Sequence, residues 1–411
     1  MPFITQFTFD KREINILPHE NFNDVNVFTI IIGKNSVGKS RLLGSIIDYT
    51  LKKESSSSKK IIAISNTSYN KFPNYKDNTS NYIKLLSVPH NGPIGYLFRQ
   101  EQEDRNFEEF KKYIITNEVN KKIKPNTYLD VRRLIPKLLL KIKENSNFTY
   151  QNLAKVLIFL NLDNSLIIRL VVRKSIFFKI QEIENIDILK KLEEINSLEI
   201  PLEDLSSLDP VIIDLILMGL IDIFRIYLYD KKSKQKINYR ELSSGQLAIL
   251  TMGLALISEL ENDSIICIDE PEVNLHPQWQ EEIINLIESI SENYKNCQFL
   301  IATHSPQIVS NLTYSNSYVL DLNSNELKHT EELKNRSADF QLTEVFSSPG
   351  NNNEYLLRKL LIILSKINSN QILNEDENHT KELVKKLYFE DKFHEKDKVK
   401  TLVELLLDLE D

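Results

Sequence analysis

The residues best suited to chemistry lie near the start of the chain, where a short apolar run ends at a glycine. FTIII, residues 28–32, is apolar and β-branched and predicts a buried strand, and SRLLGSIIDYTLKK, residues 40–53, predicts a helix. The segment between them matches G-x-x-x-x-G-K-[ST], a loop whose backbone N–H groups surround phosphate. The lysine would reach the terminal phosphates, and the serine hydroxyl would face Mg²⁺. The predicted nucleotide-binding residues are Gly33, Lys34, Asn35, Ser36, Val37, Gly38, Lys39, Ser40 and Arg41.

A second apolar run ends in acids. SIICIDEPE, residues 264–272, predicts a buried strand whose carboxyl end would lie beside the phosphate loop. Asp269 could hold Mg²⁺ together with Ser40, and Glu270 could take a proton from an attacking water. The alternative is a strand that simply ends in solvated acids.

Two shorter motifs complete the set. ELSSGQLAIL, residues 241–250, places a serine-glycine turn before an apolar helix; it is either an anion site or an ordinary capped helix start. QFLIATHSPQIV, residues 298–309, predicts a third strand with His304 at its tip, placed to touch a γ-phosphate unless it is a packing residue. The residues of the serine-glycine turn are Leu242, Ser243, Ser244, Gly245 and Gln246.

In this order, the motifs resemble those of an ABC-type ATPase head. LSSGQ is similar to the LSGGQ signature, with Ser244 at the place of its first glycine. DEPE…LHP and ATHSP resemble the soluble branch of AAA family ATPases: OLD, RecF- and SMC-like proteins, and anti-phage ATPases such as PtuA of Septu or AriA of PARIS. The resemblance implies an α/β P-loop NTPase fold that uses ATP and Mg²⁺, with Glu270, His304 and Lys39 catalytic. It also implies a head-to-tail homodimer, or a higher oligomer built from it, in which the signature of each copy completes the ATP site of the other.

The remaining sequence divides into segments. We predict that residues 1–98 and 221–346 form the ATPase core, residues 99–220 a mainly helical insertion lobe with a strand pair at 165–172 and 175–180, and residues 347–411 a helical C-terminal segment. The interval between the phosphate loop (the Walker A motif) and the signature has no heptad repeat of the kind that forms the long coiled coil of SMC-like proteins. The first glutamine in this interval, Gln100, is a candidate for the Q-loop residue. A hairpin is predicted to precede the signature.

Three segments of the sequence each allow two interpretations. The basic stretch 119–143, which includes Arg132 and Arg133, is either a solvated helix face or a surface for nucleic acid or an acidic partner. Leucines recur at helical spacing in YLLRKLLIILSKI and KVKTLVELLLDLED, where they either pack internally or dock another protein.

Composition sets the broad class. The chain has 411 residues and a formal net charge of −7, which argues against coating nucleic acid through its overall field. Cys267 and Cys297 are the only cysteines and lie in apolar runs, so we expect reduced thiols and a cytoplasmic protein without a membrane span.

The motifs predict an ATP-hydrolysing enzyme. The resemblance implies that it acts as the sensor or switch subunit of a bacterial anti-phage system and controls a separate effector such as a nuclease or toxin. A RecF- or SMC-like repair ATPase in direct contact with DNA is the second hypothesis. A non-hydrolysing, ATP-dependent scaffold is the third.

Overall fold

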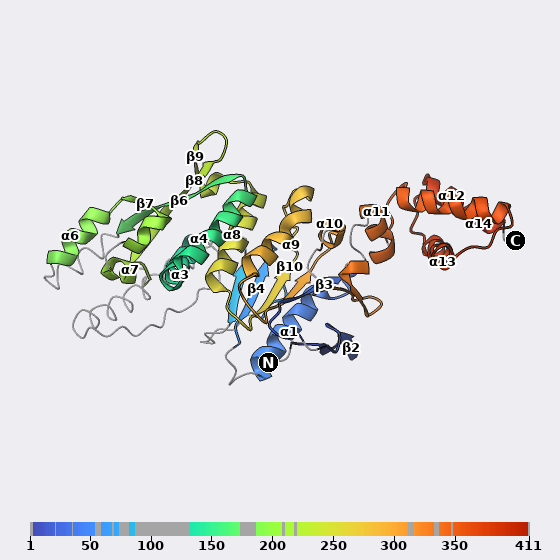
Figure 1. Ribbon diagram of the computed structural model, residues 1–411, viewed down its shortest axis with the longest axis horizontal. Coiled ribbons are helices and arrows are strands. Elements are labelled where there is room, and N and C mark those ends of the chain that lie inside the picture. Colours follow the sequence, from blue (N-terminus) through green and yellow to red (C-terminus); the bar gives the residue numbers. More distant parts are fainter. Residues whose placement is uncertain are drawn as a thin grey trace.

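The computed structural model is elongated, with a central sheet between two smaller units (Figure 1). Several sequence-based expectations concern residues outside the part that it describes: Asn35, Gln100, the side chain of Arg133, the basic residues before 131, and the second strand expected at 175–180. The described residues are 3–20, 22–34, 36–53, 59–67, 70–73, 82–86, 131–172, 186–207, 210–217, 220–310, 312, 316–332, 337–346 and 348–409.

The central sheet has seven strands in the order β13-β12-β3-β11-β10-β4-β5. All neighbours are parallel except the β12–β13 pair. The strands are β3 (Val27–Ile32), β4 (Ile61–Ser65), β5 (Tyr82–Leu86), β10 (Ile265–Asp269), β11 (Gln298–Ala302), β12 (Ser317–Asp321) and β13 (Glu326–His329). Strands from residues 1–98 and 221–346 therefore share one sheet, with β3 between β12 and β11, and the predicted α/β P-loop NTPase fold is confirmed.

Helices cover both faces of this sheet, which explains why β3, β4, β10 and β11 are buried throughout. Helix α1 (Lys39–Lys53) lies on one face, next to a hairpin of β1 (Gln6–Phe9) and β2 (Arg12–Asn15). On the other face are α8 (Ser244–Glu259) and α9 (Pro277–Ser291), while α10 (Pro306–Ser310) follows β11. Within β3, Phe28 and Ile30 face the second side and Val27 and Ile31 the first.

The insertion contains a second, antiparallel sheet in the order β7-β6-β8-β9. Its strands are β6 (Leu162–Val172), β7 (Glu199–Pro201), β8 (Ile221–Asp230) and β9 (Lys236–Asn238). The β8–β9 pair is the predicted hairpin before the signature, and it leads through a 3₁₀ turn at Tyr239–Glu241 into that motif. Because β8 pairs with β6, this sheet crosses the boundary that the sequence places at residue 220.

Helices of the insertion join it to the ATPase core. They are α3 (Val131–Glu144), α4 (Ser146–Phe159), α6 (Ile186–Ile195) and α7 (Pro210–Leu217), with a 3₁₀ turn at Leu202–Ser207. α3 and α4 pack on α8, and α4 also packs on α9. The carboxylate of Glu259 at the end of α8 is 3% exposed and forms ion pairs with Lys137 of α3 and Lys60 before β4. The insertion therefore holds the signature helix from outside.

The C-terminal segment has its own apolar core, formed by α12 (Glu354–Asn368), α13 (Glu375–Phe389) and α14 (Lys398–Asp408). The sequence predicts α12 and α14 but assigns the charged stretch between them no helix; α13 forms there with a capping box at Asn374. Short turns at Thr330–Glu332, Ala338–Phe340 and Gln341–Val345 lead from the sheet to this unit. None of the helices in the described ranges is long and apolar enough to cross a membrane.

Candidate nucleotide site

The loop between β3 and α1 has the backbone that a phosphate loop needs. Gly33 and Gly38 adopt φ values of +145° and +109°, which glycine tolerates best, and Ser36 between them lies at +67°. Helix α1 begins at Lys39, so its N-terminal N–H groups open into the loop. The Lys39 ammonium, 5% exposed, donates to the Gly33 carbonyl at 2.8 Å. Its side chain is therefore held at the centre of the loop.

Parallel pairing brings the ends of four strands to one edge of the sheet. Asp269 ends β10 in register with Ala302 of β11 and Ser65 of β4. The Ser40 hydroxyl donates to Asp269 Oδ1 at 2.9 Å, which joins the first turn of α1 to the end of β10. Burial raises the pKa of Asp269 to about 6.

Oxygen donors of this kind suit Mg²⁺. Mg²⁺ takes one or two protein oxygens and leaves its other positions to water and phosphate. A buried carboxylate that contacts one hydroxyl provides that donor set, and the described residues contain no cluster of three His, Cys, Asp or Glu that would favour a softer metal.

His304 lies between the other two predicted catalytic residues. Its Nδ1 is 3.2 Å from Lys39 Nζ, and its Nε2 is 3.8 Å from Glu270 Oε1. Burial, and then the nearby Lys39 charge, lower the pKa of His304, so the neutral ring is favoured at neutral pH. Since an ammonium only donates, Nδ1 is the acceptor and the N–H of Nε2 points toward Glu270. Burial also lowers the pKa of Lys39 to about 8.

Glu270 has a left-handed backbone at φ +52°, uncommon for a residue other than glycine. Its carboxylate lies at the same edge of the sheet as Lys39 and Asp269, where His304 contacts both Glu270 and Lys39. Glu270, Lys39, Ser40, Asp269 and His304 are thus brought together by the fold.

Two polar residues at this edge have no role in the sequence-based site. Glu272 Oε1 accepts a hydrogen bond from the backbone N–H of His304 at 2.6 Å, while its Oε2 is buried without a partner. Asn66 follows β4 and is 5% exposed; its amide donates to the Pro271 carbonyl at 3.0 Å, and its Oδ1 is likewise buried and unpartnered. The signal available in the sequence for Asn66 was a polar residue directly after a strand, and for Glu272 it was the last acid of DEPE.

The signature turn lies on a different surface. Ser243 and Gln246 form a capping box, in which Ser243 Oγ accepts from Gln246 N at 3.2 Å and Gln246 Oε1 accepts from Ser243 N at 3.0 Å. A groove of about 440 Å³ opens here, and its lining contains no residue of the phosphate loop. It is lined by Asn161, Ser243, Ser244, Gly245, Asn274, His276, Gln278 and Trp279.

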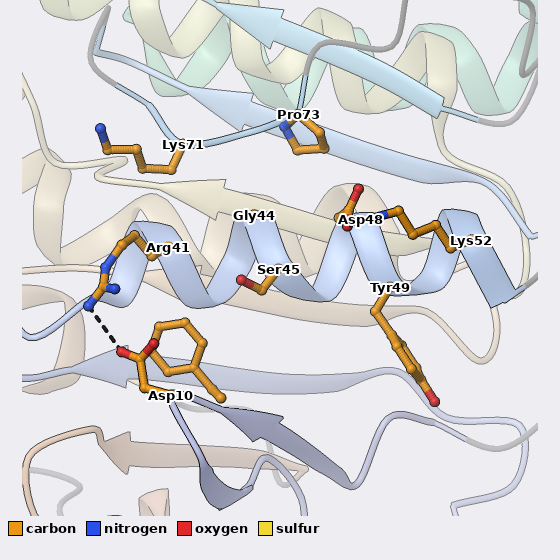
Figure 2. Close-up of a pocket in the computed structure, with 10 residues that line it drawn as sticks. Asp10, Arg41, Gly44, Ser45, Asp48, Tyr49, Lys52, Lys71 and Pro73 are labelled. Atoms are coloured by element: carbon orange, nitrogen blue, oxygen red, sulfur yellow. Dashed lines mark hydrogen bonds and ion pairs between the residues drawn. The ribbon is translucent and has the colours of Figure 1, made fainter.

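A larger groove, of about 820 Å³, runs along α1 between the β1–β2 hairpin and residues 71–73 (Figure 2). Arg41 stands at its phosphate-loop end, pairs with Asp10 at 3.1 Å, and lies 5.4 Å above the Phe9 ring. A Cβ on Gly38 would lie 3.2 Å from the Phe9 ring and 2.9 Å from Arg41 Nη2. The groove is therefore continuous with the loop.

Comparison with curated proteins finds relatives that include two retron ATPases and one Septu protein. A "Retron Ec83 probable ATPase" of Escherichia coli is 28% identical over 126 residues, 28% of this chain and 22% of that protein. A "Retron Vc95 probable ATPase" of Vibrio cholerae serotype O1 biovar El Tor is 28% identical over 174 residues, 38% and 32%. "Septu protein PtuA" of Bacillus thuringiensis is 30% identical over 122 residues, 26% and 30%. The matched segments thus span at most about a third of these relatives' length.

Solved structures resemble the chain only loosely. An SMC head bound to the C-winged helix domain of ScpA gives a TM-score of 0.33 at 14% identity, covering 79% of this chain and 94% of that one. An ATP-binding cassette of an ABC transporter in its ADP conformation gives 0.26 at 14%, covering 80% and 90%. The fold assignment above depends on the strand order and the phosphate loop, and these scores add nothing to it.

The sequence also matches a family model, described as "AAA domain, putative AbiEii toxin, Type IV TA system", over residues 28–310. That range begins in β3, ends in α10 and contains the phosphate loop, the signature, Asp269, Glu270 and His304. Because the match covers more than half of the chain, the chain belongs to this AAA domain family and resembles the retron and Septu ATPases.

Proposed function

We propose that this chain hydrolyses ATP to ADP and phosphate with the residues gathered at the edge of the central sheet. The observation that carries the proposal is the network Ser40–Asp269 and Lys39–His304–Glu270, in which every contact lies within 3.8 Å. These residue types fit phosphoryl transfer, which needs positioned charge and a water-activating base more than covalent chemistry.

Each side chain has a defined task in this proposal. Lys39 binds the terminal phosphates, and His304 donates from Nε2 to the phosphoryl oxygens. Glu270 accepts the proton of the attacking water. Mg²⁺ would be held by Ser40 and Asp269, and it supplies neutralisation of phosphate charge. The Phe9–Arg41 end of the α1 groove would take the nucleoside, with the ring offering a stacking surface.

The signature would act from a second copy. Because its groove shares no lining residue with the phosphate loop, one chain presents both halves of a composite site on different surfaces. A head-to-tail homodimer would join them, so that ATP closes the dimer and hydrolysis releases it.

Complementation tests this arrangement directly. Lys39→Ala and Ser243→Arg should each remove turnover, yet a one-to-one mixture should recover about a quarter of wild-type activity, since half the dimers would hold one intact site. Mixing Lys39→Ala with Glu270→Gln is the control, because both changes affect the same half-site; in the mixed dimer each composite site carries one defect, and no activity should return. An inactive first mixture that still dimerises would overturn the shared site.

The wider role we propose is that of sensor or switch in a cytoplasmic anti-phage system, controlling a separate effector such as a nuclease or toxin. The retron and Septu names of the relatives support this. Phage challenge of cells carrying the chain with its genomic neighbours provides the test. Protection should vanish with Lys39→Ala; protection that persists would contradict the proposal.

Glu270→Gln separates this enzyme from a scaffold that only binds ATP. An enzyme should lose turnover by about 100-fold or more and accumulate as ATP-bound dimers. A scaffold would keep its partner interactions and cellular function unchanged.

A further inference from the structure

One face of the insertion sheet is partly exposed and carries basic and aromatic side chains, although the chain has a negative net charge. In β6 and β8 alternate residues are buried, with Leu166, Ile168, Ile226 and Leu228 in the core. The outward positions between them are only partly covered, and Phe224 is 46% exposed. The β8–β9 hairpin stands away from the body of the molecule (Figure 1).

Two arginines lie directly opposite each other on this face. Arg169 of β6 and Arg225 of β8 are register partners in the antiparallel pair. Like charges at such positions repel and destabilise a sheet. Both guanidinium groups donate to the Tyr227 hydroxyl, Arg225 at 3.3 Å, and these bonds lower the pKa of Tyr227. The Nε of Arg169 is buried and has no hydrogen-bond partner among the residues that the structure describes. Glu199 of β7 is the register partner of Arg169 on its other side and also pairs with Lys236, so it offsets part of the repulsion. A phosphate would add a second anion to this group of cations.

Aromatic rings alternate with these cations. The Arg225 guanidinium lies 5.1 Å above the Phe224 ring, and Lys236 Nζ lies 4.0 Å above the Tyr227 ring. Lys236 also forms an ion pair with Glu199 of β7. Phe224 and Tyr227 therefore provide flat surfaces beside positive charge, as in proteins that bind single-stranded nucleic acid.

The hairpin turn extends the positive charge. Lys231, Lys232 and Lys234 are exposed there. Asp230 is engaged by the Ser233 side chain and by the backbone N–H groups of Lys232 and Ser233, and Asp163 pairs with Lys234. Asp230 and Asp163 thus have hydrogen-bond partners of their own, and the exposed side chains of Lys231 and Lys232 can reach phosphates in solvent.

We propose that this face of the β7-β6-β8-β9 sheet binds single-stranded nucleic acid, with phosphates on Arg169, Arg225 and the hairpin lysines, and a base stacked on Phe224. A duplex fits less well, because its bases are already stacked on each other and offer no free face to the aromatic ring.

The surface also adjoins the signature, and this part of the inference rests on the proposed ATPase function. Lys231 N donates to the Asn161 carbonyl at 3.2 Å, and Asn161 lines the signature groove with Ser243. β9 continues through a single 3₁₀ turn into Leu242. Nucleic acid on the sheet could therefore alter the signature and the ATPase rate of a partner copy.

Binding is tested first without nucleotide, on the full chain, by fluorescence anisotropy with a mixed-sequence DNA strand of about 16 nucleotides. Arg169→Gln combined with Arg225→Gln should weaken binding by about 10-fold or more and reduce the slope of log K against log salt by about 1.4. Phe224→Ala should cost about 5- to 100-fold with little change in slope. Arg225→Lys, which keeps the charge, should retain most of the salt slope.

The matched control removes the same charge from the C-terminal helices, with Arg358→Gln and Lys398→Gln, and should bind like the wild type. Equal losses in both double variants would overturn the site. A dissociation constant above about 10⁻⁴ M for the DNA strand at about 50 mM salt would also overturn the site, as would binding to an acidic protein but not to DNA.

ATP turnover is measured separately. The single-stranded DNA should stimulate ATP turnover in the wild type. It should not do so in the Arg169→Gln/Arg225→Gln variant, whose basal rate of ATP turnover should be unchanged. If neither the wild type nor the variants hydrolyse ATP, the ATPase proposal is contradicted. The anisotropy result would still decide whether the sheet binds single-stranded nucleic acid.

Discussion

At the scale of single residues, a carboxylate from a neighbouring turn holds the backbone of His304. Glu272 accepts from His304 N, and burial raises the pKa of the Glu272 carboxyl while the hydrogen bond from His304 N opposes that rise. His304 is the residue that joins Lys39 to Glu270. Glu272 is therefore expected to position the histidine rather than to contact ATP.

Substitution at Glu272 should separate positioning from chemistry. Glu272→Ala should lower kcat by about 10- to 100-fold, since small displacements of a catalytic group have effects of that size. Glu272→Gln keeps an acceptor and should retain most of the activity. In a His304→Ala background, Glu272→Ala should add no further loss; a full additional loss would show an independent role.

Both thiols should be inert in the native protein. Burial raises the pKa of Cys297 to about 12 and that of Cys267 further, so the unreactive thiol form predominates at ordinary pH. At pH 8 we expect no labelling by a disulfide reagent until urea unfolds the core, when both cysteines should react. Rapid labelling of the folded chain would contradict the burial of these side chains.

At the scale of elements, the signature helix fits closely against the insertion. A Cβ on Gly253 of α8 would lie 2.6 Å from a methyl carbon of Val156 on α4. This contact fixes the distance between the two helices, because Gly253 and Val156 are both buried and neither position can move into solvent.

Gly253→Ala should destabilise the fold by about 1–3 kcal/mol through overpacking. Combination with Val156→Ala should recover part of that loss, because the smaller neighbour makes room for the added methyl group. Urea unfolding of the two single variants and the double variant measures the coupling. Strict additivity would indicate that the helices can move apart.

At the scale of the whole molecule, the C-terminal helices form a core separate from that of the ATPase sheet. They also reach the phosphate loop, where Glu390 at the end of α13 lies 3.6 Å from Lys34 Nζ. That pair is half exposed, so it adds little stability.

Leu360→Ala should therefore unfold the C-terminal unit selectively. Leu360 is fully buried in that core, and its truncation should cost about 2–5 kcal/mol. Ellipticity should show an early urea transition, while ATP turnover persists to the wild-type midpoint. Coincident loss of both signals would mean that the two cores fold as one unit.

The sequence by itself determined the phosphate loop, Asp269, Glu270 and His304. Each lies within a few residues of a strand or a helix start, and local hydrophobic pattern and glycine placement are enough to set such a turn. The α/β class follows from the same strand and helix alternation.

Only the tertiary structure decided which distant residues meet. Glu272 reaches His304 and Asn66 reaches Pro271 because β4, β10 and β11 pair in parallel. Arg169 faces Arg225 because β6 pairs with β8 across the expected boundary at residue 220. Strand pairing and register depend on the burial of a shared core, which no single segment of the sequence contains.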